Sequence, residues 1–189
     1  GIMPLKTKWI DILYNVATGS KKVRYFFTPI GTIFYGLLIF IFVVIALYAD
    51  RVTGLTNLFP NPYHIIISLP FFFLALLLIG WSVQNFLKEK GTPVPFNPPP
   101  KLVTSGPYAY TRNPMLTGVF SLLFGFGAFF GSAFLLIVFT PLFIYINYWE
   151  LKYIEEPELE KRIGEEYIEY RKRTPMFFPN FKIVFGKRE

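Results

Sequence analysis

Residues 113–149 read NPMLTGVFSLLFGFGAFFGSAFLLIVFTPLFIYINYW, and none of these 37 residues is Asp, Glu, Lys or Arg. A helix that crosses a bilayer about 30 Å thick needs roughly 20 apolar residues. The stretch is therefore too long for one span, and Gly131-Ser132 provides a natural break. We expect a tight helical hairpin with arms near residues 115–130 and 132–148.

Two further stretches, residues 25–49 and 52–87, also lack charged side chains. They predict single spans near residues 30–48 and 65–87. The chain is 53% hydrophobic and only 16% charged, whereas soluble domains are about 25% charged. We predict an all-α, polytopic integral membrane helical bundle with a C-terminal helical cap. A soluble all-α protein with buried helices is the alternative.

The basic residues predict the orientation of this bundle. Of the 19 Lys and Arg residues, Arg51 alone lies in the loop between the first two spans. Basic loops of membrane proteins face the cytoplasm, so we expect a multi-pass protein of the cell membrane with its active site on the cytoplasmic side. We interpret the net charge of +7 as contact with anionic lipid headgroups, and we expect no nucleic-acid partner.

Several kinds of site are excluded or disfavoured. The chain has no cysteine and a single histidine, His64, so thiolate chemistry and a Ser-His-Asp triad are absent and we expect no metal site. The glycines in GFGAFFG lie inside an apolar span, where they favour helix packing over dinucleotide binding. We expect no cleavable signal peptide, because the first apolar stretch starts too far into the chain.

The sequence divides into three segments. Residues 1–29 contain an amphipathic stretch at 5–18 that predicts an interfacial helix, or alternatively a partial fifth span. Residues 30–87 hold the first two spans, and residues 88–189 form the predicted catalytic region. That region begins with a proline-rich loop at 88–107, which is either a stiff linker or, because it is longer than a connection requires, a binding loop.

Polar residues gather where the predicted spans meet the cytoplasmic edge. Ser82 and Asn85 end the second span, Arg112 and Asn113 precede the third, and Asn147, Glu150 and Glu155 follow the fourth. All of them lie beside the proline-rich loop. Their coincidence predicts a site at this edge of the membrane.

Two motifs in this region resemble a known family. KLVTSGPYAYTRNPMLTG (101–118) and EEPELEKRIGEEYIEYRKRTPMFFP (155–179) are similar to the isoprenylcysteine carboxyl methyltransferases, whose broader relatives are the membrane phospholipid methyltransferases. The resemblance implies S-adenosylmethionine as methyl donor, S-adenosylhomocysteine as product, and the carboxylate of a prenylated cysteine or a similar lipid as acceptor. By the same resemblance, the cofactor-binding residues are Pro100, Lys101, Leu102, Val103, Tyr108, Asn113, Pro114, Met115, Leu116 and Glu155.

This chain departs from the family pattern at two positions. Asn113 replaces a common histidine, and Leu151 replaces an arginine thought to face the substrate. The second departure puts the acceptor in doubt more than the cofactor. We expect Arg112 to orient the carboxylate of the acceptor or cofactor, with a headgroup anchor as the alternative.

Three other functions stay open on the sequence. A phospholipid N-methyltransferase would use the same cofactor but would need a base for its amine. A membrane sterol or lipid reductase carries a similar Arg-Asn-Pro pattern and binds NADPH. A non-catalytic membrane scaffold would bind neither cofactor. We expect the protein to be a monomer in the bilayer.

Overall fold

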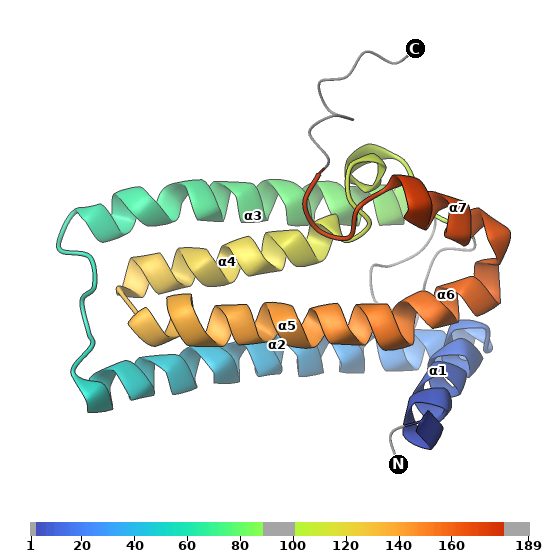
Figure 1. Ribbon diagram of the computed structural model, residues 1–189, viewed down its shortest axis with the longest axis horizontal. Helices are drawn as coiled ribbons and strands as arrows, with labels where there is room; N and C mark the ends of the chain where they lie inside the picture. Colours follow the sequence, from blue (N-terminus) through green and yellow to red (C-terminus); the bar gives the residue numbers. More distant parts are fainter. Residues whose placement is uncertain (1–2, 89–100, 180–189) are drawn as a thin grey trace, which may run out of the picture.

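The computed structural model describes residues 3–88 and 101–179, and its regular structure in this part of the chain is entirely helical (Figure 1). The predicted all-α class is confirmed. The elements are α1 (Met3–Ala17), α2 (Lys21–Thr53), α3 (Tyr63–Lys88), η1 (Gly106–Ala109), α4 (Pro114–Phe130), η2 (Leu135–Phe139), α5 (Thr140–Glu150), η3 (Leu151–Glu155), α6 (Glu156–Ile163) and α7 (Glu165–Arg173).

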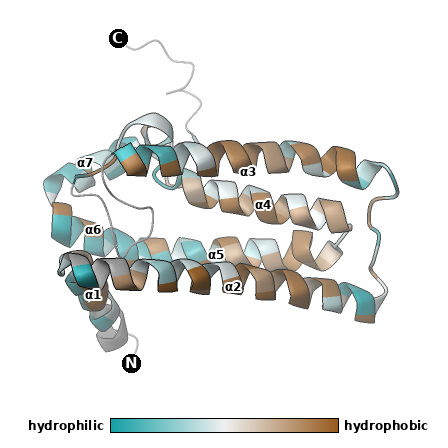
Figure 2. Ribbon diagram, turned by 180° about the vertical axis from the view of Figure 1, so that it is seen from behind, coloured by the Kyte–Doolittle hydropathy of each residue, from teal (hydrophilic) through white to brown (hydrophobic). Residues whose placement is uncertain are grey.

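Three helices of the described chain are long and apolar enough to cross a membrane. They are Phe26–Thr53, Tyr63–Lys88 and the continuous run Leu135–Ile163. The apolar helix α4 lies alongside them; its 17 residues span about 25 Å at 1.5 Å per residue. In Figure 2 the middle of the bundle is apolar and the end that carries α6 and α7 is hydrophilic. The chain is therefore an integral, multi-pass membrane protein.

The helices begin and end somewhat differently from the sequence prediction. Helix α2 starts at Lys21, before the predicted start of the span, and continues through Pro29. Helix α1 contacts α6 and η3, and it is not among the spanning helices. The C-terminal helix is divided by Gly164, whose φ of 78° and ψ of −139° suit glycine far better than other residues.

Helices α3 and α4 pack closely because small residues of α4 face α3. A Cβ added at Gly118 would lie 2.8 Å from Ile79 Cγ1, and one at Gly125 would lie 2.8 Å from the Phe72 ring. Between these glycines, the Ser121 hydroxyl donates to the backbone oxygen of Phe71 at 2.9 Å. Small residues permit such close contact between helices in membranes.

The predicted break at Gly131-Ser132 is confirmed. Gly131 has φ of 60°, in the left-handed region, and its N–H closes the turn on the Ala128 oxygen. The buried Asp50 carboxylate then accepts from the Ser132 hydroxyl and, at 3.1 Å, from the Phe134 N–H. Asp50 thereby binds free donors at the start of the second arm, and α2 supports the hairpin turn.

An apolar core lies between α2, α4 and α5. Phe143 is 1% exposed, and its ring contacts those of Tyr35, Phe42 and Phe120. Leu123 and Leu135 are fully buried in the same cluster. This core holds α2, α4 and α5 together. The hydrophilic end of the bundle lies beside it; we call it the polar end and define it by η1, the first turn of α4, η3, α6 and α7.

Candidate functional site

The η1 turn lies on the end of α3. Gly106 has φ of 60°, and a Cβ at this position would lie 2.6 Å from the Asn85 side chain. Pro107 is fully buried, and Asn85 is held by a 2.8 Å bond from its Nδ2 to the backbone oxygen of Trp81. The Gly-Pro pair therefore brings η1 against the polar end of α3.

Tyr108 is the buried side chain of η1. Its ring meets the Phe86 ring edge-on at 5.2 Å, and its backbone oxygen accepts a 2.6 Å bond from the Tyr170 hydroxyl. Burial raises the pKa of the Tyr108 phenol. The Ser82 hydroxyl partly offsets this rise in pKa, and the Glu155 carboxylate adds to it. Tyr108 thus joins α3, α7 and the Glu155 region.

The residues between η1 and α4 pair with the chain after α7. The backbone N–H of Arg112 donates to the Pro175 oxygen at 2.8 Å, and that of Asn113 donates to the Met176 oxygen at 3.1 Å. The Asn113 side chain also reaches the Met176 oxygen, at 3.3 Å. Asn113 is thus held by the C-terminal tail, and Pro114 begins α4 without an N–H of its own.

The Arg112 guanidinium lies inside the polar end, with its side chain only 10% exposed. Nη2 forms a 2.5 Å ion pair with Glu156, and Nη1 donates to the backbone oxygens of Arg171 and Thr174 at 2.9 and 2.6 Å. Its Nε is buried without a partner in the described chain. This geometry differs from a headgroup anchor and leaves the Nε–H of Arg112 available to a ligand.

A π-helical turn carries the last predicted cofactor residue, Glu155. The Glu156 N–H bonds the Leu151 oxygen, five residues back, as in π-helices, which often occur at functional sites. Glu150 and Glu155 flank and end this turn, and neither forms an ion pair with another described residue. One turn earlier, the Tyr35 hydroxyl donates to Asn147 Oδ1 at 3.2 Å.

The other predicted cofactor residues are distributed around α4. Val103 and Pro114 are buried, Leu102 and Met115 are half-buried, and Lys101 is exposed. Leu116 packs against the apolar core. Pro100 lies outside the described residues. Apart from Pro100, these residues lie on the segment that enters α4 or in its first turn.

A comparison with family models decides the family of this chain. Residues 63–166, more than half of the chain, match the model of the phospholipid methyltransferase family. The chain belongs to the phospholipid methyltransferase family. A comparison with curated proteins found no match. The matched residues run from the start of α3 to the start of α7. They include all of the polar end except most of α7.

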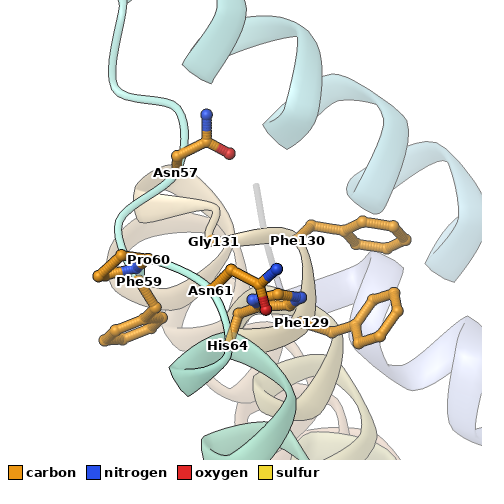
Figure 3. A pocket seen from close by; sticks show the side chains of 8 residues that line it. All are labelled: Asn57, Phe59, Pro60, Asn61, His64, Phe129, Phe130 and Gly131. Atoms are coloured by element: carbon orange, nitrogen blue, oxygen red, sulfur yellow. The ribbon is translucent and has the colours of Figure 1, made fainter.

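A cavity of about 300 Å³ lies at the other end of this methyltransferase, beside the hairpin turn (Figure 3). It is lined by Asn57, Phe59, Pro60, Asn61, His64, Phe129, Phe130 and Gly131. No residue predicted for the site lies there. His64 lies in the first turn of α3 at this end, and the centroid of its ring lies 6.0 Å from that of Phe129.

Sequence reasoning missed several residues that organise the methyltransferase site. The sequence motif points to Glu155 and gives no sign that the neighbouring Glu156 is the partner of Arg112. Tyr170 belongs to the second motif, but the motif does not predict its hydrogen bond to the Tyr108 oxygen, 62 positions away in the chain. The π-helical turn at Leu151–Glu155 was also missed, because the sequence carries no signal for it.

Proposed function

We propose that this membrane methyltransferase transfers a methyl group from S-adenosylmethionine to the amine of a membrane lipid at the polar end. The observation that carries the proposal is the pair of carboxylates, Glu150 and Glu155, which form no ion pair with a described cation. The neighbouring Glu156 and Glu158 are paired with Arg112 and Arg162. Glu150 and Glu155 are therefore available to cationic ligands.

The described residues fit S-adenosylmethionine. When bound, it supplies an electrophilic methyl group on a positively charged sulfonium. Glu155 can accept from its ammonium or ribose hydroxyls, and Arg112 Nε, buried without a partner, can donate to its carboxylate.

The environment of Leu151 supports an amine over a carboxylate as acceptor. Leu151 occupies the position of the substrate-facing arginine in the carboxyl methyltransferases, and it is only 2% exposed. A carboxylate acceptor would need a cation or several donors in place of that arginine. S-adenosylmethionine has a net positive charge and neutralises one of the two carboxylates. An ammonium acceptor complements the other.

The carboxylate of a prenylated cysteine remains the second candidate, because the Gly-Pro-Tyr and Arg-Asn-Pro motifs resemble those of the carboxyl methyltransferases. In that case Arg112 Nε would serve the acceptor. Family membership favours either methyltransferase over the reductase and scaffold alternatives. We also propose that the polar end faces the cytoplasm, since Arg51 is the only one of the 19 basic residues of the sequence that lies between the first two predicted spans, and basic loops of membrane proteins face the cytoplasm.

The test is methyl transfer from methyl-labelled S-adenosylmethionine by the full chain in nanodiscs. One set contains phosphatidylethanolamine, and a second contains phosphatidylcholine with added farnesylcysteine. We expect label in the aminophospholipid, and label only in farnesylcysteine would contradict the amine acceptor. Calorimetry should show that Glu155→Gln weakens S-adenosylmethionine binding, whereas the exposed control Glu169→Gln does not. Equal affinity of both variants would remove Glu155 from the cofactor site.

A further inference from the structure

The π-helical turn brings Glu150 and Glu155 onto one side of their helix. In an α-helix of 3.6 residues per turn, residues five apart point in clearly different directions. In η3 the hydrogen bond from the Glu156 N–H to the Leu151 oxygen spans five residues, so residue 155 lies about one turn above residue 150. The two carboxylates are close enough to repel one another.

The two carboxylates differ in depth along the bundle. The chain runs from the hairpin turn at Gly131 toward the polar end (Figure 1), so Glu150 lies one turn nearer the middle of the bundle than Glu155. Asn147 and its partner Tyr35 lie deeper still. A polar cofactor enters from the polar end, and a lipid enters from the apolar middle. Glu155 is therefore placed toward the cofactor and Glu150 toward the lipid acceptor.

We propose that Glu150 is the base that removes a proton from the lipid ammonium group; this proposal rests on the amine acceptor proposed above. A primary ammonium resembles that of lysine, whose pKa is near 10.4, and it has no lone pair for attack. The Glu150 carboxylate accepts the proton as the N–H bond breaks, and the electron pair stays on nitrogen. That pair then forms the N–C bond while the C–S bond breaks, and its electrons remain on sulfur as a neutral sulfide.

The groups around Glu150 leave it free for this role. Tyr35 faces it from α2 and Glu155 faces it from η3. On α6, Glu156 and Glu158 are held by arginines, and on α1, Asp11 pairs with Lys161 at 2.8 Å. Of these carboxylates, Glu155 and Glu150 alone form no ion pair with a described cation, and Glu155 is assigned to the cofactor.

The experiment measures turnover of Glu150→Gln against pH, with the full chain in nanodiscs that contain phosphatidylethanolamine. We expect S-adenosylmethionine affinity within twofold of wild type and turnover lowered about 10²–10⁴-fold near pH 7, the usual contribution of a general base. The loss should shrink as pH rises, because the free amine then forms in solution. A purely structural defect would not respond to pH in this way.

The outcomes separate the two proposals. If wild type methylates the aminophospholipid and Glu150→Gln is fully active, or is impaired equally at every pH, the role of Glu150 is overturned and the proposed function stands. If wild type methylates farnesylcysteine alone, both are overturned. Should Glu150→Gln not fold, Glu150→Asp replaces it. Because Asp keeps a carboxylate at this position, Glu150→Asp should retain partial activity with the same pH dependence as wild type. Full activity with a changed pH dependence would contradict the proposal.

Discussion

Arg112 and Glu156 form a 2.5 Å ion pair in which both side chains are about nine-tenths buried. The pair joins the start of α4 to α6 across 44 residues of sequence. Two further bonds from Arg112 reach backbone oxygens at the end of α7. One guanidinium therefore connects the membrane hairpin to the C-terminal cap.

Arg112→Ala should destabilise the fold. Removing one partner of a buried ion pair costs about 3–5 kcal/mol, and the remaining 3.7 Å contact with Arg171 would compensate the Glu156 charge only in part. Thermal unfolding in detergent should show a large decrease in midpoint, and Arg112→Lys should recover little of it because lysine cannot replace the planar fork. The exposed Arg173→Ala is the control, and an Arg112→Ala midpoint equal to that of the control would disprove the structural role.

Tyr170→Phe should loosen η1 with a smaller effect on stability. The change removes the 2.6 Å hydrogen bond to the Tyr108 oxygen, and a buried carbonyl left without its donor costs about 1–3 kcal/mol. Chemical unfolding measures the loss. Tyr110→Phe, at an exposed tyrosine of the same segment, should change nothing; equal effects of the two variants would mean that the bond contributes little.

Gly118→Ala should separate α4 from α3. Its new Cβ would lie 2.8 Å from Ile79 Cγ1 and 3.2 Å from the Ala75 oxygen, and such overpacking typically costs about 1–3 kcal/mol. Gly80→Ala, on α3, is the matched control because nothing lies within 4 Å of its added Cβ. Unfolding in detergent should give Gly118→Ala a lower stability than both Gly80→Ala and wild type. A Gly118→Ala variant as stable as wild type would show that the helices can shift apart.

Stability should fall in alkaline solution because three tyrosines at the polar end are buried. Burial raises the pKa of Tyr108, Tyr167 and Tyr170 above the ordinary value near 10. Above pH 10 the unfolded chain loses these protons first, so the stabilisation present below pH 10 is lost as pH rises. Unfolding measured from pH 8 to 11.5 checks this. Tyr167→Phe should reduce the slope, and an unchanged slope would contradict the prediction.

The sequence alone determined the class of the protein. Uncharged stretches of membrane-spanning length can satisfy their backbone hydrogen bonds in lipid only as helices, so the spans followed from composition. The Gly131 break followed from the excess length of residues 113–149. Segregated charges and the Tyr108 and Asn113 motifs located the polar end.

The tertiary structure alone decided which charges are paired. Sequence reasoning assigned Arg112 to a ligand, but the fold brings it to Glu156 and to the backbone after α7. It also missed the π-helical turn that places Glu150 beside Glu155. Ion pairing depends on distances of a few ångströms between residues far apart in the chain, and a one-residue change in helical repeat alters which side chains share a face; neither is encoded in local sequence pattern.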